Sequence, residues 1–192
     1  MIDFAKIFLL SDGDRRGAFR AQNSNELLTK EFLFGTEDDG VKVDFCWLQG
    51  SKFYDFIATG YSGVYLVSER VCSILQVSRY RGFSLRPIIL EDKKKQVVDG
   101  YRLLSVVCEV GPIINEKSIK KIMPPRVPWA DRYEAYVGLY FDPSTWDGSH
   151  FFHPAGTSLI YVVEEVKQLF EENQVSNCRF DKIVDLENYA II

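Results

Sequence analysis

The stretch VYLVSERV at positions 64–71 changes in mid-course from a continuous apolar run to the polar opening of a helix. Ninety-five residues later the chain repeats this change in LIYVVEEV at positions 159–166. Sliding the sequence against itself by the same offset extends the match, without a gap, over 55–90 and 150–185. Repetition of this kind indicates a repeated structural unit, here a strand, turn, strand, helix, strand. The alternative is chance similarity between two β-α-β segments, because few of the matched residues are identical.

The helix of each unit is predicted from the spacing of its apolar residues. A one-sided apolar stripe requires the positions i, i+3 and i+4. These positions are held by Val71, Ile74 and Leu75 in the first unit and by Val166, Leu169 and Phe170 in the second. Ser68 can cap the first helix, and glutamates open both helices, where they complement the positive end of the helix dipole.

Other segments predict additional strands. Residues 1–10 form an apolar run that we interpret as a strand. Residues 31–34 and 41–48 are expected to pair as a hairpin, because the Asp-Gly dipeptide between them supplies a positive φ. A second hairpin is expected between 84–90 and 101–110, with a lysine-rich turn exposed to solvent.

The segment 111–133 is predicted to be a long loop. Its prolines interrupt regular structure, and only 116–123 is free enough of them for a short helix. Regular alternation resumes as a strand over 133–141. We therefore predict a single α+β domain over 1–192, with a mainly antiparallel sheet, a duplicated β-β-α-β unit and two principal helices.

Composition excludes several classes of protein. With 192 residues, 46% apolar and 26% charged, the chain resembles a folded globular domain and differs from a disordered chain. Its net charge of −4 argues against non-specific nucleic-acid binding, which needs a basic face. Asp3 stands where a secretory signal would have basic residues, and no apolar run approaches the roughly 20 residues that span a bilayer. We expect a cytoplasmic protein without a membrane segment.

The residues that usually perform chemistry do not form a recognisable motif. Cys46, Cys72, Cys108 and Cys178 are far apart in apolar stretches, and we expect them to be buried thiols. His150 and His153 are followed by Pro154, which favours an extended backbone over a helical metal-binding pair. Glycine-rich nucleotide loops and a nucleophile elbow are also missing from the sequence. We expect no catalytic residue, metal or cofactor, although an enzyme with scattered catalytic residues remains the alternative.

Several side chains are candidates for binding another protein. Trp and Tyr are frequent binding hot spots, and acidic residues can contact a basic partner. The candidates are Glu37, Asp38, Asp39, Tyr61, Trp129, Asp131, Tyr133 and Trp146. Alternatively, each aromatic residue covers a neighbouring sheet, and the acidic run is a solvated turn.

Part of the chain is similar to a known family. VYLVSERV at 64–71, followed by GFSLRPI at 82–88, resembles the "v-S-e-k-l … G-v-e-f-x-P-v" signature of bacterial polymorphic-toxin immunity proteins, formerly described as a domain of unknown function. YRLLSVV at 101–107 resembles the central strand of that family, and FDP with GSHFF over 141–152 resembles its approach to the second unit. The resemblance covers 41–186. In the second unit, Val163 and Asn177 replace the family's Ser and Gly.

The resemblance implies a small cytoplasmic protein that binds a cognate toxin domain and blocks its active site or its access to substrate. It implies no catalytic residue. An acidic chain suits a toxin with a basic cleft, so we expect the acids of 37–39 and the loop 129–133 to be contacts. The alternative is a non-catalytic scaffold or adaptor domain in a secretion or phage-derived assembly.

Overall fold

The fold is α+β with mostly antiparallel sheets and two α-helices in the described part of the chain, as the sequence predicts. The computed structural model describes residues 2–24, 43–125 and 127–188. One sheet contains β1 (Ile7–Asp12), β8 (Glu109–Val110), β11 (Phe151–Pro154), β12 (Ile160–Val163) and β13 (Cys178–Lys182), in the order β13-β1-β12-β11-β8. A second contains β2 (Arg20–Asn23), β3 (Val43–Gln49), β4 (Phe56–Ala58), β5 (Tyr65–Ser68), β6 (Phe83–Glu91) and β7 (Tyr101–Val106), in the order β2-β3-β6-β7-β5-β4.

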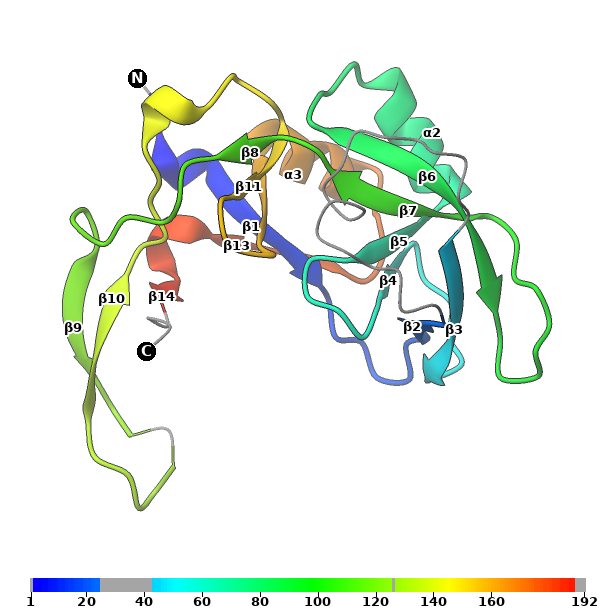
Figure 1. Cartoon of the computed structure of the whole chain (residues 1–192), viewed down its shortest axis with the longest axis horizontal. Coiled ribbons are helices and arrows are strands. Elements are labelled where there is room, and N and C mark those ends of the chain that lie inside the picture. Colours follow the sequence, from blue (N-terminus) through cyan, green and yellow to red (C-terminus); the bar gives the residue numbers. More distant parts are fainter. Residues whose placement is uncertain (1, 25–42, 126, 189–192) are drawn as a thin grey trace.

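The remaining elements complete the molecule (Figure 1). A three-stranded sheet contains β9 (Ile119–Met123), β10 (Tyr133–Val137) and β14 (Glu187–Asn188), in the order β14-β10-β9. The α-helices are α2 (Glu69–Val77) and α3 (Glu164–Glu172). Short 3-10 turns are η1 (Phe4–Lys6), η2 (Pro143–Thr145) and η3 (Ile183–Asp185). Within the described ranges, no helix has the length and apolar character to cross a membrane.

The two predicted units have the same architecture. Strands β11 and β12, helix α3 and strand β13 each begin 95 residues after β4, β5, α2 and β6. The strand register is also the same, because Phe56 lies opposite Val67 as Phe151 lies opposite Val162. In each unit an additional strand from elsewhere in the chain, β7 or β1, runs antiparallel between the second and third strands. Descent of the units from one copied segment stays a prediction.

The units pack against each other through reciprocal contacts. The backbone N–H of Phe56 donates to the Ser176 carbonyl (3.2 Å), and Phe151 in the second unit donates to the corresponding Arg81 carbonyl (3.1 Å). A Cβ added to Gly63 would collide with the carbonyl oxygen of Ser158, the residue that occupies the same place in the second unit. Each residue here meets the counterpart of its own partner, as residues do across the two-fold axis of a homodimer. The two units of this single chain therefore pack like the two subunits of such a dimer.

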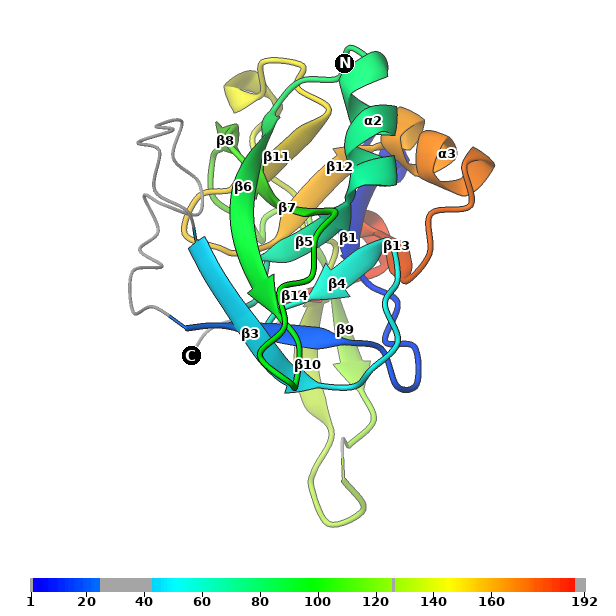
Figure 2. The same cartoon turned by 90° about the vertical axis from the view of Figure 1, so that its right-hand side faces the viewer.

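The two helices lie next to each other and run in opposite directions (Figure 2). At the start of α2, Arg70 Nη1 donates to the carbonyl of Asn173, which follows α3 (2.8 Å). After the end of α2, the Tyr80 hydroxyl donates to the carbonyl of Glu165 in the first turn of α3 (3.1 Å). The Ser68 hydroxyl caps α2 by accepting from the Val71 N–H (3.4 Å), as predicted, whereas α3 begins without a side-chain cap.

A shared core explains why the strands at the centre of the molecule are apolar on both faces. Tyr65 and Val67 of β5 belong to the larger apolar cluster, which also contains side chains of the second unit such as Phe152. Val64 and Leu66 point into a second, smaller cluster. A strand covered on both sides has no solvent face, so the run VYLV shows no polar alternation.

The structure corrects the predicted strand and loop boundaries at several places. The expected strand 101–110 ends at Val106, and β8 is a separate strand that runs parallel to β11. The chain at 1–10 forms a strand only from Ile7 onward. Of the predicted hairpin 31–48, only β3 belongs to the described residues. Three of the four cysteines are partly exposed rather than buried, and all four are free thiols.

The predicted loop 111–133 with a helix at 116–123 is wrong. Residues 119–123 form β9, which pairs antiparallel with β10 so that Lys121 lies opposite Ala135. Ile119, Ile122 and Met123 have helical spacing, but pairing with a strand ten residues away overrides that local preference. Pro124, Pro125 and Pro128 lie in the turn between the two strands, where they do not interrupt pairing, and Pro112 lies before β9.

Substitution of Gly63 tests the packing of the two units. Gly63→Ala places a methyl group against the Ser158 carbonyl and also forces alanine into the left-handed region (φ +74°). Gly100→Ala is the matched control, because Gly100 has a similar φ (+85°) and open space around it. In urea denaturation, we expect the control to lose about 1–2 kcal/mol and Gly63→Ala to lose a further 1–3 kcal/mol, roughly the cost of overpacking. Equal losses would contradict the close contact.

Candidate functional site

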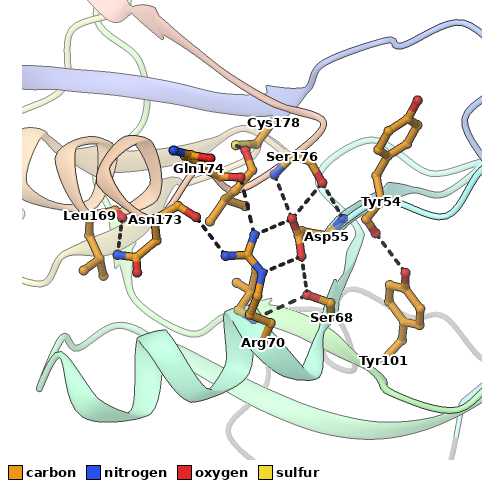
Figure 3. Close-up of polar contacts among 12 residues, drawn as sticks. Tyr54, Asp55, Ser68, Arg70, Tyr101, Leu169, Asn173, Gln174, Ser176 and Cys178 are labelled. Atoms are coloured by element: carbon orange, nitrogen blue, oxygen red, sulfur yellow. Dashed lines mark hydrogen bonds and ion pairs between the residues drawn. The ribbon is translucent and has the colours of Figure 1, made fainter.

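A cluster of hydrogen bonds centred on Asp55 joins the two units (Figure 3). The Arg70 guanidinium binds both carboxylate oxygens, with Nη2 2.6 Å from Oδ2 and Nε 3.1 Å from Oδ1. The Ser68 hydroxyl donates to Oδ1 (2.9 Å). From the second unit, Ser176 donates to Oδ2 through its hydroxyl (2.7 Å) and its backbone N–H (2.9 Å). Both oxygens of the carboxylate are therefore engaged.

These contacts keep Asp55 ionised. Partial burial would raise its pKa, but the hydrogen bonds from Arg70, Ser176 and Ser68 outweigh burial and hold the pKa well below its usual range. A carboxylate in this state does not accept a proton at neutral pH. The carboxylate is placed to hold the two units together and not to act as a general base.

The equivalent place on the other side of the interface has a different chemistry. His150 corresponds to Asp55, and its Nδ1 accepts a hydrogen bond from the Arg81 N–H (3.3 Å). The His150 ring stacks on Tyr80, with centroids 4.4 Å apart. Burial lowers the pKa of His150, so the ring is neutral at pH 7. The contact between the units is therefore ionic at Asp55, whereas at His150 it is a neutral aromatic stack.

A cavity of about 320 Å³ lies between α3 and β13. Its lining consists of Phe170, Glu171, Gln174, Val175, Cys178, Arg179 and Phe180. Burial raises the pKa of the Cys178 thiol to about 11, so this thiol is protonated at neutral pH and is a poor nucleophile. Among the residues that the structure describes, no group of three or more His, Cys, Asp and Glu side chains is placed to hold a metal ion.

Several exposed apolar side chains lie on a hairpin that we name the arm: β9, β10 and the turn between them, residues 119–137. Figures 1 and 2 show it extending away from the other two sheets. Trp129 in the turn is 85% exposed, and Ile119 and Ile122 of β9 are 59% and 70% exposed. Exposed apolar groups gathered on one element are typical of protein-binding sites.

Contacts along the arm fix its shape. The Lys120 ammonium lies 2.7 Å from the Glu134 carboxylate and 5.6 Å from the centre of the Tyr136 ring, so the strands are joined by side chains as well as by backbone pairing. The Tyr133 hydroxyl donates to the Glu187 carboxylate of β14 (3.2 Å). Ala135 of β10 is buried.

The base of the arm is attached to the second unit. The Leu139 N–H donates to the carbonyl of Ile183 (2.9 Å), and the Leu139 carbonyl accepts from the buried Tyr161 hydroxyl (3.2 Å). The Ser118 hydroxyl donates to the Gly138 carbonyl (2.7 Å). The arm therefore starts from a rigid platform, which reduces the entropy that a partner loses on binding it.

The structure brings only part of the predicted site together. Trp129, Asp131 and Tyr133 all lie on the arm, whereas Tyr61 lies on the turn between β4 and β5, where it is 46% exposed. The acidic run Glu37, Asp38 and Asp39 lies outside the described residues.

Trp146 is partly buried at the edge of the core. Its ring packs on the buried Phe152, with centroids 5.7 Å apart, and its indole N–H donates to the Ser149 carbonyl (3.0 Å). The side chain is partly buried and covers the larger apolar cluster. This packing agrees with the alternative stated from the sequence, in which an aromatic candidate covers a neighbouring sheet.

Sequence reasoning missed β9, which contributes Ile119, Lys120, Lys121 and Ile122 to the arm. A signal for it exists in the sequence. The run Ile-Lys-Lys-Ile is followed by Pro-Pro and then by the alternating Tyr-Glu-Ala-Tyr-Val, which is the pattern of two strands around a proline-containing turn.

Asp55→Asn tests whether the carboxylate is a structural joint. The pKa of Asp55 is lower in the folded than in the unfolded protein, so its stabilisation is complete above the unfolded pKa of about 4 and is lost as pH falls below it. In urea denaturation at neutral pH, we expect Asp55→Asn to lose about 1.5–3 kcal/mol, the range for a hydrogen bond to a charged group. The deficit relative to wild type should shrink below about pH 4. Asp99→Asn, at an exposed position, is the control. Its stability should equal that of wild type both at neutral pH and below about pH 4.

Comparison of the sequence with models of known protein families and with characterised proteins finds no match.

Proposed function

We propose that this chain is a non-catalytic protein-binding module that acts as an immunity protein. It would bind a cognate antibacterial toxin domain in the cytoplasm and block the toxin's active site or its access to substrate. The observation that carries the proposal is the arm, which holds Trp129 at 85% exposure on a platform built from two interlocked units.

The energetics of the arm support a binding role. A tryptophan in water gains free energy when a partner covers it, and tryptophans are among the residues whose truncation costs the most at protein interfaces, about 2 kcal/mol or more. β9 exposes one further isoleucine on each of its faces, Ile119 and Ile122. Because hydrogen bonds fix the arm on both sides of its base, a partner need not order it on binding.

The class of the partner is supported by a different observation. The segments at 64–71 and 82–88 resemble the signature of polymorphic-toxin immunity proteins. In this structure those segments form β5, the start of α2 and the start of β6, so they belong to the platform. Under the proposal, the platform is the common part of such proteins and the arm is the part that selects one toxin.

Co-expression tests the immunity function. If the chain is an immunity protein, we expect a toxin-domain reading frame immediately upstream of its gene. We expect this chain to restore the growth of bacteria that express the toxin domain, and we expect the two proteins to elute as one complex in size-exclusion chromatography. Neither rescue nor a complex would contradict the proposal and would favour a scaffold or adaptor domain.

Truncation of Trp129 tests the role of the arm in that complex. Trp129→Ala should weaken toxin binding by at least about tenfold, because about 1.4 kcal/mol corresponds to a factor of ten and interface tryptophans usually exceed it. Val77→Ala is the matched control, since Val77 at the end of α2 is 83% exposed. Calorimetry should give an unchanged affinity for the control and an unchanged Tm for both variants. Equal toxin affinities for the two variants would show that Trp129 is not part of the interface.

A further inference from the structure

The outer edge of β9 offers backbone hydrogen-bonding groups to another chain. β9 pairs with β10 on one side, and within residues 2–24, 43–125 and 127–188 no strand pairs with its other side. Figure 1 shows this edge on the outside of the molecule. An uncovered edge strand is a template to which an extended segment can add by backbone hydrogen bonds.

The side chains of β9 define what such a segment must carry. Because side chains alternate along a strand, Ile119 and Lys121 lie on one face and Lys120 and Ile122 lie on the other. Each face therefore combines one exposed isoleucine with one lysine. The order Ile-Lys-Lys-Ile is the same in both directions, so a parallel and an antiparallel segment would meet the same sequence of groups.

The charge on the arm is opposite in sign to that of the chain. Residues 119–137 contain four basic and two acidic residues, whereas the whole chain has a net charge of −4. Lys120 is paired with Glu134 at 2.7 Å. Lys121 is exposed and forms no ion pair with any other residue that the structure describes. A partner at this edge therefore meets unneutralised positive charge.

The same charge disfavours a second copy of this chain as the partner. If two β9 strands paired with their Ile-Lys-Lys-Ile runs aligned, lysines would lie opposite lysines. Like charges directly across a strand pair are destabilising, and lysines on an edge strand are a common protection against self-association. An acidic segment in place of the second β9 would instead be attracted to these lysines.

We propose that β9 binds an extended segment of a partner protein with the pattern apolar-acidic-acidic-apolar, which adds a strand to the β14-β10-β9 sheet. Its acidic side chains lie near Lys120 and Lys121, and its apolar side chains cover Ile119 and Ile122. That the segment belongs to a toxin domain rests on the proposed function. The chemistry of the segment follows from β9 alone.

The probe for this site is the blocked peptide Thr-Val-Glu-Glu-Val-Thr, with Thr-Val-Lys-Lys-Val-Thr as its charge-reversed control. In an NMR titration of the isotope-labelled full chain, we expect the glutamate peptide to shift amide signals of β9 and β10 and to slow hydrogen exchange at alternate residues of β9. Added salt should weaken this binding, because both partners are exposed to solvent. The lysine peptide should leave the β9 signals unchanged.

Lys121→Glu tests the role of charge at the edge. We expect it to weaken binding of the glutamate peptide by about three- to tenfold, because a favourable cross-strand pair becomes a repulsive one. Lys182→Glu is the matched control, since Lys182 is an exposed lysine on β13, the edge strand of another sheet, and its reversal should leave the affinity unchanged. Thermal unfolding should give the same Tm for both variants as for the unmodified chain.

The outcomes separate the two proposals. Equal response of β9 to the two peptides, no response to either, or equal effects of the two lysine variants would overturn strand addition by an acidic segment. A toxin complex whose affinity is unchanged by Lys121→Glu would also overturn it and would leave the immunity function standing. Peptide binding without toxin rescue would overturn the immunity function and leave strand addition standing, since the peptide experiment needs no toxin.

Discussion

The reciprocal packing of the two β-β-α-β units is the constraint on which the rest of the molecule depends. Gly63 meets its own counterpart Ser158 so closely that no side chain fits between them, and the larger apolar cluster takes side chains from both units. Asp55 closes one side of this contact with charged hydrogen bonds, whereas His150 closes the other by stacking on Tyr80. Neither unit alone could cover the apolar face that it turns toward the other.

The arm depends on this platform for its position. It leaves the body beside Leu139, whose backbone is bound to Ile183 and to the buried Tyr161 of the second unit. The arm itself has few buried side chains, and a two-stranded hairpin is marginally stable on its own. Rigidity at the base thus allows the chain to present an exposed surface without unfolding around it, and this is the property that a binding element needs.

The sequence predicts the parts of this fold that are encoded locally. The apolar spacing of α2 and α3, the Ser68 cap and the β6–β7 hairpin are each encoded within a few residues, and the structure contains all of them. The 95-residue offset also predicts the order of elements in both units. These signals are local or periodic, so they can be read without knowledge of tertiary contacts.

What the sequence does not predict arises from contacts between distant segments. Nothing near β1 or β7 shows that each is inserted between two strands of a unit. Ile119 and Ile122 have the spacing of a short helix, and only pairing with β10 makes them a strand. For the candidate site, Trp129, Asp131 and Tyr133 were identified as residue types, but the lysines that set the charge of the arm were not. Their significance depends on β9 being an edge, which is a property of the sheet.

The insertion of β1 between β12 and β13 has a consequence for how the chain reaches its native state. β1 is synthesised first among these strands, but both of its neighbours come from 160–182, near the end of the described chain. Ile7, Phe8 and Leu10 therefore stay without their neighbouring strands while the ribosome makes residues 13–159. The five-stranded sheet closes after translation of its last strand, a non-local step that is slow and leaves an apolar segment open to chaperones or to aggregation in the meantime.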